Sequence, residues 1–335
     1  MILLVTGGAG FIGSNLIRQI IDQPAIERLI NLDALTYAGH LENLTAVANH
    51  PKYQFEKVDL REAKAVAEVF KRSPITHVLH LAAESQVDRS ITGPDAFVQT
   101  NFTGTFHLLE ACRAAWGSNY GNKRFHHVST DEVYGSLGAT GRFTEESPYA
   151  PNSPYAASKA AADMIVRAYH HTYGLPTLIT NCSNNYGPCQ MPEKLIPVVI
   201  QNAIARRPIP LYGDGLHVRD WLHVNDHVDA LWQVLTRGTA GRVYNIGGNC
   251  ERTNLLLVQT ICDLVDELAP RLGGNSRKLI RFVEDRPGHD RRYAIDSTRI
   301  ERELGWRPKK PFEAGLCETV QWYLQNQEWV KAVTS

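Results

Sequence analysis

The stretch that decides the fold is ILLVTGGAGFIGSNLIRQII, residues 2–21. Its first four residues are apolar and predict a short strand, and apolar residues recur at helical spacing over 11–21. Between them, Gly7 permits a tight turn, Gly10 lets the backbone approach a pyrophosphate, and Gly13 lets the helix pack on the strand. A helix N-terminus offers phosphate free N–H groups and a positive dipole end. The strand, the glycine turn and the helix together predict a dinucleotide-binding site.

An acidic residue follows the second expected strand, residues 29–32. Asp33 stands where a carboxylate accepts hydrogen bonds from an adenosine ribose and repels a 2′-phosphate. The next three residues, Ala34, Leu35 and Thr36, supply no cation that could hold such a phosphate. This pattern predicts NAD rather than NADP as the cofactor.

Strands and helices continue to alternate through the first half of the chain. Further strands are expected over 53–58, 77–81, 124–129 and 176–180, and long helices over 94–116 and 153–173. Such alternation predicts an α/β fold with a Rossmann-type, doubly wound parallel sheet. Ligands bind such sheets at the carboxyl ends of the strands. The residues expected at those ends are Gly7, Asp33, Asp59, Ala82 and Thr130.

The pattern changes after residue 182, where turn residues become frequent. Helices are expected over 194–205, 226–236, 255–268, 298–304 and 312–325, with a short strand over 243–246. We therefore expect two domains: an NAD-binding domain over 1–182, and a smaller, mixed α/β substrate domain over 183–335. The segment 218–246 is expected to return to the first domain.

Bulk composition excludes several classes of function. The chain has 335 residues, with 35 basic and 35 acidic side chains, so its balanced charge does not favour nucleic acid or an acidic membrane surface as the main partner. Six scattered cysteines form no CxxC pair, which indicates free thiols and a cytoplasmic location. No apolar run reaches the ~20 residues of a membrane span, and no signal peptide is expected. The histidines show no recognised ligand spacing, so no metal is expected.

Two residues of the expected helix 153–173 can oxidise an alcohol. Tyr155 and Lys159 are four positions apart and therefore share one helix face. A phenol with a pKa near ~10 becomes a base at neutral pH only if positive charge stabilises its anion. A lysine ammonium one turn away, together with a nicotinamide cation, is a source of that charge. Thr130 can hydrogen-bond the same substrate hydroxyl.

Two adjacent carboxylates, Asp131 and Glu132, follow Thr130. Alcohol oxidation needs one base, which Tyr155 already supplies, so two further groups suggest an acid and a base for proton removal and leaving-group protonation. Burial and mutual repulsion can push the pKa values of two neighbouring carboxyls apart. On these residues alone, the pair could equally be a solvated turn.

Several motifs together resemble the dTDP-glucose 4,6-dehydratase family, a group of nucleotide-sugar dehydratases among the extended short-chain dehydrogenases/reductases. They are TGGAGFIG, LAAES, STDEVYG, YAASK, NNYGP, PEKLIP, RDWLHV, YNIGG and DRPGHDRRYAID, and they span nearly the whole chain. STDEVYG and DRPGHDRRYA are the most specific of them. The related 4-epimerases lack an acidic pair after the active-site Ser/Thr, and they remain an alternative, as does a dehydratase of another nucleotide-hexose.

The resemblance implies a reaction cycle. Tyr155 takes the proton of the glucose 4-hydroxyl while C4 loses hydride to NAD⁺. Glu132 removes the C5 proton, and Asp131 protonates O6 so that water leaves. Hydride then returns to C6 while Glu132 reprotonates C5. The implied product is dTDP-4-keto-6-deoxyglucose, and the implied cofactor is a tightly held NAD that is regenerated in each turnover.

The resemblance also implies binding roles. The implied cofactor contacts are Phe11, Ile12, Asp33, Ala34, Leu35, Thr36, Asp59, Leu60, Leu81, Ala82, Ala83, Thr100, Tyr155, Lys159 and Asn184. The implied substrate contacts are Ser85, Thr130, Asn185, Glu193, Lys194, Leu195, Pro210, Tyr212, Arg219, Asn254, Arg286, His289 and Tyr293. Arg219 and Arg286 are suited to a pyrophosphate because guanidinium groups bind phosphate bidentately.

Three positions depart from the family's usual residues, namely Gln86, Cys189 and Met191. None of them is a proposed catalytic residue. The resemblance further implies a homodimer, formed by helices near 94–116 and 153–173.

Overall fold

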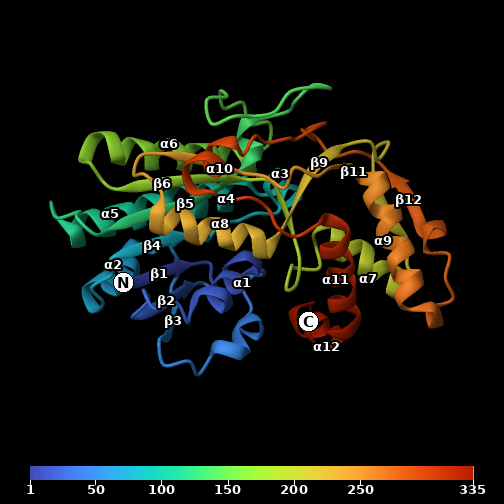
Figure 1. Ribbon diagram of the computed structural model, residues 1–335, viewed down its shortest axis with the longest axis horizontal. Coiled ribbons are helices and arrows are strands. Elements are labelled where there is room, and N and C mark those ends of the chain that lie inside the picture. Colours follow the sequence, from blue (N-terminus) through green and yellow to red (C-terminus); the bar gives the residue numbers. More distant parts are fainter. Residues whose placement is uncertain (335) are drawn as a thin grey trace.

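The computed structural model describes residues 1–334. Its central feature is a seven-stranded sheet in the order β10-β6-β5-β4-β1-β2-β3, in which every neighbouring pair is parallel (Figure 1). The strand order reverses between β1 and β4, and this is where α/β sheets bind their ligands. The strands are β1 (Ile2–Thr6), β2 (Arg28–Asp33), β3 (Tyr53–Lys57), β4 (His77–His80), β5 (Arg124–Thr130), β6 (Thr177–Cys182) and β10 (Val243–Ile246).

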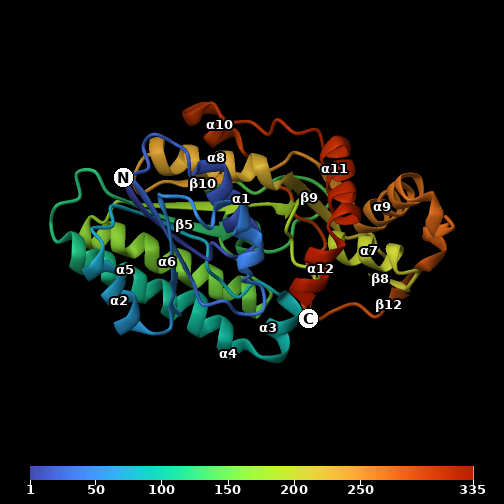
Figure 2. The ribbon, with the colours of Figure 1, turned by 90° about the horizontal axis from the view of Figure 1, so that it is seen from below.

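Helices cover both faces of this sheet, as Figure 2 shows. One face carries α1 (Phe11–Ile20), α8 (Val224–Arg237) and α10 (Thr298–Leu304), and the other carries α2 (Ala63–Arg72), α5 (Thr105–Trp116) and α6 (Pro154–Tyr173). Successive strand side chains point to opposite faces. Leu3 and Val5 of β1 therefore join the core under α1 and α8, while Ile2 and Leu4 join the core under α2 and α5.

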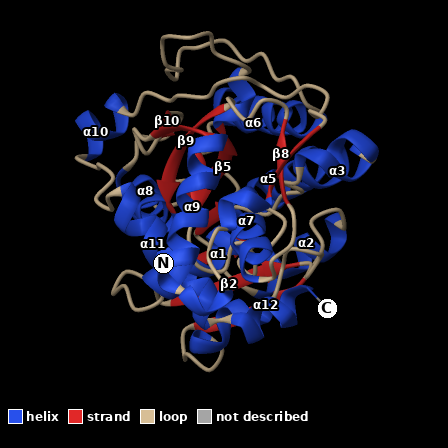
Figure 3. Cartoon of the chain, turned by 90° about the vertical axis from the view of Figure 1, so that its right-hand side faces the viewer, coloured by secondary structure: helices blue, strands red, loops and turns tan. Residues whose placement is uncertain are grey.

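The second half of the chain builds a smaller lobe beyond one end of the sheet, at the right of Figure 1 and facing the viewer in Figure 3. Its strands form two small sheets: β7 (Asn184–Tyr186) with β9 (Val218–His223) and β11 (Glu251–Thr253), and β8 (Ile209–Tyr212) with β12 (Ile280–Val283). Helices α7 (Leu195–Ile204), α9 (Asn254–Leu268) and α11 (Phe312–Gln325) share one apolar core. Two short 3₁₀ turns, Pro270–Leu272 and Ser276–Leu279, complete the lobe.

The last helix, α12 (Gln327–Thr334), returns to the N-terminal half. It packs against the 3₁₀ helix η1 (Leu41–Val47), and Trp329 Nε1 donates a hydrogen bond to Asn43 Oδ1 at 2.8 Å. The segment 218–246 divides between the two halves of the molecule. Its β10 pairs with β6 of the large sheet, whereas β9 pairs with β7 and β11 of the small one.

The helix expected over 94–116 contains a π-helical segment. It runs as α4 (Pro94–Phe97), η2 (Val98–Gly104) and α5, after the short helix α3 (Val87–Thr92). A Cβ at Gly104 would lie 2.9 Å from Leu60 Cβ, so only glycine permits this close approach. π-helical turns are frequent at functional sites, and Thr100 of this one faces the cavity described below.

The predicted fold class is confirmed, including each strand of the parallel sheet. The sequence did not reveal α3, α12 or the strands β7, β8, β9, β11 and β12. Across residues 1–334, no helix combines the length and apolar character needed to cross a bilayer.

Candidate active site

A cavity of about 330 Å³ opens at the carboxyl ends of the sheet strands. Its wall comes from the ends of β1, β2, β4, β5 and β6, from η2 and α6, and from the segment 183–194. The location agrees with the reversal of strand order between β1 and β4. Residues from both halves of the chain therefore meet at one site.

The glycine turn after β1 is built for close backbone contact. Gly7 has φ 71°, and a Cβ there would lie 2.7 Å from Ala82 Cα. A Cβ at Gly13 would lie 2.2 Å from Gly7 O, so glycine is required where α1 crosses the turn. Helix α1 begins after Gly10 without a side-chain cap, which leaves its first N–H groups for a ligand. This cradle fits a pyrophosphate.

Asp33 has a structural role that the sequence did not reveal. One carboxylate oxygen accepts the N–H of Ala9 at 2.9 Å, and the other accepts the N–H of Leu35 at 2.9 Å. Burial raises the pKa of Asp33, and these two backbone hydrogen bonds oppose that rise. The carboxylate lines the cavity and keeps further lone pairs for ribose hydroxyls. It therefore fixes the glycine turn as well as facing the ligand.

Thr130, Asp131 and Glu132 lie where β5 ends and a short 3₁₀ helix (Asp131–Tyr134) begins. The Thr130 hydroxyl accepts the N–H of Glu132 at 3.3 Å and lies 3.4 Å from Asp131 Oδ1, to which it donates. In the described chain, Asp131 Oδ2 is buried without a hydrogen-bond partner, although it belongs to a cavity-lining residue. Such an unpaired buried oxygen is suited to a substrate hydroxyl.

Tyr155 and Lys159 enter the cavity from the first turns of α6. Ser153 caps this helix by accepting the N–H of Ala156 at 3.1 Å. Lys159 Nζ donates to the carbonyl oxygen of Val128 at 2.8 Å, and Thr130 lies close enough to Tyr155 to oppose the rise in its pKa. The hydroxyl, the two carboxylates, the phenol and the amine therefore surround one cavity, as the sequence predicted.

The two carboxyls share a direction of pKa shift but differ in their surroundings. Burial raises the pKa of Asp131 well above its ordinary value, and the charges of Glu132 and Asp220 raise it further. Burial also raises the pKa of Glu132, but the cations Arg286, Arg219 and Lys194 oppose that rise. Asp131 is thus the better placed to stay protonated, and Glu132 the better placed to act as a base.

The pKa of the Tyr155 phenol differs from the expectation. Burial raises the pKa of Tyr155 well above 10, and nearby Glu132 adds to the rise, while Thr130 opposes it. Burial also lowers the pKa of Lys159 to about 8. The helical spacing of Tyr155 and Lys159 suggested a lowered phenol pKa, but within the chain alone desolvation outweighs the lysine.

Most predicted cofactor residues line the cavity. They are Gly7, Gly10, Phe11, Ile12, Gly13, Asp33, Ala34, Thr36, Asp59, Leu60, Leu81, Ala82, Ala83, Thr100, Tyr155, Lys159 and Asn184. The exception is Leu35, whose side chain packs against the apolar core while its N–H binds Asp33.

The predicted substrate residues divide into two groups. Ser85, Thr130, Asn185, Glu193 and Lys194 line the cavity. Leu195, Pro210, Tyr212, Arg219, Asn254, Arg286, His289 and Tyr293 lie off its wall, in the smaller lobe and the loop after β12.

The second group is connected to the cavity through its cations. Arg219 lies over the ring of Tyr293, with its guanidinium carbon 4.3 Å from the ring centroid, and donates to the carbonyl oxygen of Asp290 at 2.9 Å. Arg286 reaches Asp88 at 3.4 Å, and its buried Nε has no partner in the described chain. Arg219 and Arg286 both act electrostatically on Glu132, which places them beside the Asp131–Glu132 pair.

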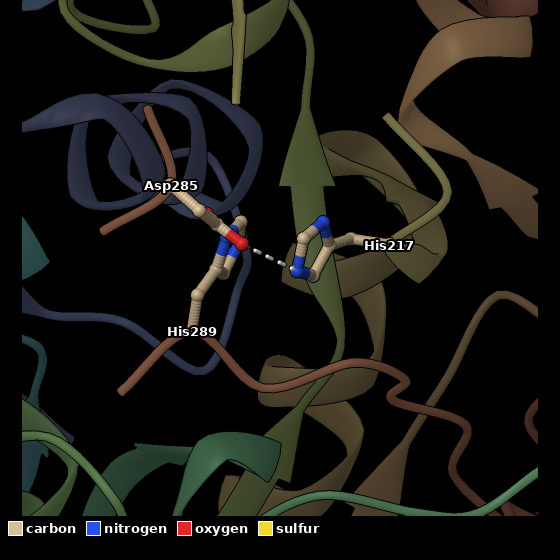
Figure 4. A group of neighbouring side chains, drawn as sticks. All are labelled: His217, Asp285 and His289. Carbon is tan, nitrogen blue, oxygen red and sulfur yellow. Dashed lines mark hydrogen bonds and ion pairs between the residues drawn. The ribbon is translucent and has the colours of Figure 1, made fainter. Parts of the chain in front are cut away.

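Two stacked histidines lie beside Asp285, as Figure 4 shows, and Arg219 and Arg286 are near enough to act electrostatically on one of them, His289. The rings of His217 and His289 are 3.7 Å apart at an interplanar angle of 14°. Asp285 joins them, with one oxygen 3.3 Å from His217 Nε2 and the other 2.6 Å from His289 Nδ1. The two ring nitrogens are thus paired with the carboxylate, which fixes His289 at the start of the segment that carries Tyr293.

Other cavity residues escaped the sequence reasoning. They include Arg61, Glu84, Ser129, Cys182, Ser183, Gln190 and Met191. Ser129 could have been found, since it ends the expected strand 124–129, whereas Ser183 follows the observed end of β6, beyond the expected strand 176–180. Gln190 could not, because it follows no recognisable element, and the sequence marked Met191 only as a departure from the family's usual residue.

Comparisons with known proteins agree with this geometry. Residues 4–319 match the family model described as GDP-mannose 4,6 dehydratase. A dTDP-glucose 4,6-dehydratase of Neisseria meningitidis is 56% identical, over 98% of this chain and 94% of that protein. A crystal structure of the Bacillus anthracis dTDP-glucose 4,6-dehydratase in complex with NAD has a TM-score of 0.88 at 49% identity, covering 99% of each chain. That of Streptomyces venezuelae, also with NAD bound, has a TM-score of 0.91 at 47% identity, covering 99% of this chain and 100% of that one. The chain therefore belongs to the GDP-mannose 4,6 dehydratase family.

Proposed function

We propose that this protein is a dTDP-glucose 4,6-dehydratase, which converts dTDP-glucose to dTDP-4-keto-6-deoxyglucose and water. The observation that carries the proposal is the Asp131–Glu132 pair on the wall of the cavity that also holds Tyr155 and Lys159. A reaction that only oxidises and reduces one carbon does not need that pair. Relatives at 56% and 53% identity that carry this name support the choice of nucleotide and sugar.

The cavity fits NAD. The uncapped start of α1 and the glycine turn would hold the pyrophosphate, and Asp33 would accept the adenosine ribose hydroxyls. Asn184 Oδ1 is buried on the cavity wall without a partner in the described chain, so a ligand group can satisfy it. Bound NAD supplies the hydride acceptor and later the hydride donor, together with a positive ring that favours the Tyr155 anion.

The chain's own residues handle the protons. Tyr155 takes the proton of the C4 hydroxyl, and Thr130 hydrogen-bonds the same oxygen. Once C4 is a ketone, the C5 proton is acidic and Glu132 removes it, helped by the three cations that favour its ionised form. Asp131, whose pKa burial raises well above its ordinary value, donates its proton to O6 as the C6–O6 bond breaks and water leaves. Glu132 finally returns a proton to C5.

The smaller lobe would bind the nucleotide. Lys194 bridges the two halves, since its Nζ donates to the carbonyl oxygen of Ser85 at 2.7 Å and to Gln86 Oε1 at 3.2 Å. Arg219 and Arg286 are the side chains that would neutralise the pyrophosphate. We assign residues 1–182 with β10 and α8 to cofactor binding, and the remainder to the nucleotide sugar.

Incubation with dTDP-glucose in D₂O tests the function. We expect a 4-keto-6-deoxy product that carries solvent deuterium at C5, observed by NMR. Unchanged sugar, or a C4 epimer without deuterium at C5, would contradict the proposal. UDP-, CDP- and GDP-hexoses under the same conditions test the choice of base.

The protein is further proposed to be a cytoplasmic homodimer. The described cysteines are all free thiols, which suits a reducing compartment. Four large apolar side chains are exposed on the helical segments 94–116 and 154–173: Val98 (48%), Phe106 (39%), Met164 (49%) and Tyr173 (47%). Such exposure indicates a surface that a partner subunit covers.

Phe106→Glu with Met164→Glu should convert the dimer to a monomer in light scattering, whereas Phe282→Glu, which changes an apolar side chain of the other lobe, should not. Unchanged mass in the double variant would contradict this interface.

A further inference from the structure

We propose that Asp163 is a positioning residue whose carboxylate is the buried counter-ion of Lys159. The inference rests on the proposed function, in which Lys159 supports Tyr155. Tyr155, Lys159 and Asp163 are spaced at four-residue intervals along α6, so they form one stripe that leads from the cavity into the protein interior. Asp163 has no exposed surface and does not line the cavity, so the reaction cycle gives it no direct part.

Burial raises the pKa of Asp163 to about 7, and the charge of Lys159 and hydrogen bonds from two hydroxyls oppose that rise. Ser129 Oγ and Tyr149 OH both donate to Asp163 Oδ2 at 2.9 Å. His127 Nε2 lies 3.2 Å from Asp163 Oδ1 and is the third polar group beside the carboxyl. Two hydroxyl donors on one oxygen stabilise a carboxylate. An uncharged carboxyl would have only His127 to accept its proton.

Asp163 reaches Lys159 across His127. His127 Nε2 is 3.5 Å from Lys159 Nζ and 3.2 Å from Asp163 Oδ1, so the imidazole lies between the amine and the carboxyl. Lys159 is itself buried, and within residues 1–334 its one hydrogen bond to the backbone goes to the carbonyl oxygen of Val128. A buried ammonium needs a compensating negative charge.

The other titratable groups around this pair cannot supply that charge. Toward Lys159, β4 presents His80, β5 presents His127 and β6 presents Cys182. Burial lowers the pKa of both histidines and raises that of the Cys182 thiol to about 12, so all three are neutral at neutral pH. Toward Asp163, the loop before α6 presents Tyr149 and the 3₁₀ helix after β5 presents Tyr134, both neutral phenols with raised pKa values.

Asp163 therefore sets the pH range over which Lys159 stays charged. Burial alone lowers the pKa of Lys159, and the charge of Asp163 is the first influence that opposes this effect. Without that charge, Lys159 loses its proton at lower pH, and the Tyr155 anion then loses the positive charge that stabilises it.

The test is the titration of Lys159 in the whole enzyme. Protein labelled with ¹³C at lysine Cε is titrated by NMR, with Lys159→Arg used to assign the signal. We expect Asp163→Asn, which keeps the shape and an acceptor oxygen, to lower the pKa of Lys159 by about one pH unit or more. Tyr149→Phe removes a hydrogen bond but keeps the charge, so it should cause a clearly smaller shift. An equal Lys159 pKa in wild type and Asp163→Asn, or equal shifts in both variants, would overturn the proposal.

Two further measurements complete the test. The ¹³Cγ signal of Asp163 in the wild-type protein should change to that of a carboxylate as the pH rises through about 7, while Lys159 is still protonated. A carboxyl that stays protonated until Lys159 has lost its proton would overturn the proposal even if Asp163→Asn fails to fold. In turnover of dTDP-glucose, the basic limb of the kcat–pH profile should move to lower pH in Asp163→Asn, which a loss of stability alone would not produce. The NMR measurements need no substrate, so a wild-type protein that makes no product would count against the proposed function and not against Asp163.

Discussion

Asp33 Oδ2 accepts the N–H of Ala9 at 2.9 Å, which joins the end of β2 to the glycine turn that follows β1. The other oxygen holds Leu35, whose φ of 53° is unusual for a branched side chain. One carboxylate thus fixes two turns and still faces the cavity. Asp33, which is expected to hydrogen-bond the ribose, therefore also shapes the glycine turn that is expected to bind the pyrophosphate.

Asp33→Asn should weaken NAD binding, because Asp33 both fixes the glycine turn and faces the cavity. An amide keeps one acceptor oxygen but places an NH₂ group against one of the two backbone donors. Hydrogen bonds to charged groups contribute about 1.5–3 kcal/mol, so we expect a loss of about ten- to a hundredfold in affinity. Titration calorimetry of cofactor-free protein measures it. The preference for NAD over NADP should also fall, because the carboxylate no longer repels a 2′-phosphate; an unchanged preference would contradict the assigned role.

Arg219→Lys should raise KM for the nucleotide sugar by about tenfold with a small effect on kcat. A lysine keeps the charge but loses the bidentate fork that suits a pyrophosphate. It also loses the stacking on Tyr293 and the hydrogen bond to the carbonyl oxygen of Asp290. Steady-state kinetics checks this, with Arg291→Lys as the control, since Arg291 is exposed and paired with Asp214. Equal effects of the two variants would show that Arg219 does not bind the substrate.

Glu132→Gln should separate the oxidation from the elimination. Removing a general base costs about 10²–10⁴-fold in kcat. Tyr155 and Lys159 remain, so oxidation at C4 should persist and reduced cofactor should accumulate, visible as absorbance on mixing with substrate. Deuterium uptake at C5 should fall with kcat. A 4-epimerase would instead keep most of its activity in this variant, and that result would contradict the proposed dehydratase function. Glu146→Gln, on an exposed carboxylate paired with Arg299, serves as the control.

The sequence predicted the parts of the fold that follow a strong local pattern. The apolar strands β1–β6 and the glycine turn predicted the parallel sheet. Because parallel strands end at the same edge of a sheet, the sequence also predicted that Asp33 and Thr130 lie near each other. In the small sheets, β7 and β11 have three residues each, too short for a readable alternation, and β9 was missed because Arg219, Asp220 and His223 interrupt its apolar residues. Helix α12 is held by a distant contact, Trp329 with Asn43, which local pattern cannot reveal.

The site shows the same division. Thr130, Asp131, Glu132, Tyr155 and Lys159 were predictable because each is near in sequence to an element that places it. The pKa of Tyr155 was not, because helical spacing reports proximity to Lys159 but not the desolvation of the phenol. The arginine side of the site depends on contacts between residues more than 70 positions apart, such as Arg219 with Asp290.

Asp131→Asn should stabilise the fold while it removes activity. A carboxyl whose pKa is raised on folding binds more protons in the native state than in the unfolded chain, so stability falls as pH rises from its ordinary pKa of 3.8 through the raised value. Asparagine does not titrate, and its amide oxygen can still accept from Thr130, so the variant avoids that loss.

The gain in unfolding free energy of Asp131→Asn over wild type should therefore increase from about pH 5 to pH 8, while kcat falls by about 10²–10⁴-fold because O6 has lost its acid. Urea unfolding at several pH values measures the first effect. Asp95→Asn, at an exposed side chain in the first turn of α4, is the matched control and should show no such trend. A gain that is independent of pH would mean that Asp131 is not held protonated by the fold, and the acid of the elimination would then have to be sought elsewhere on the cavity wall.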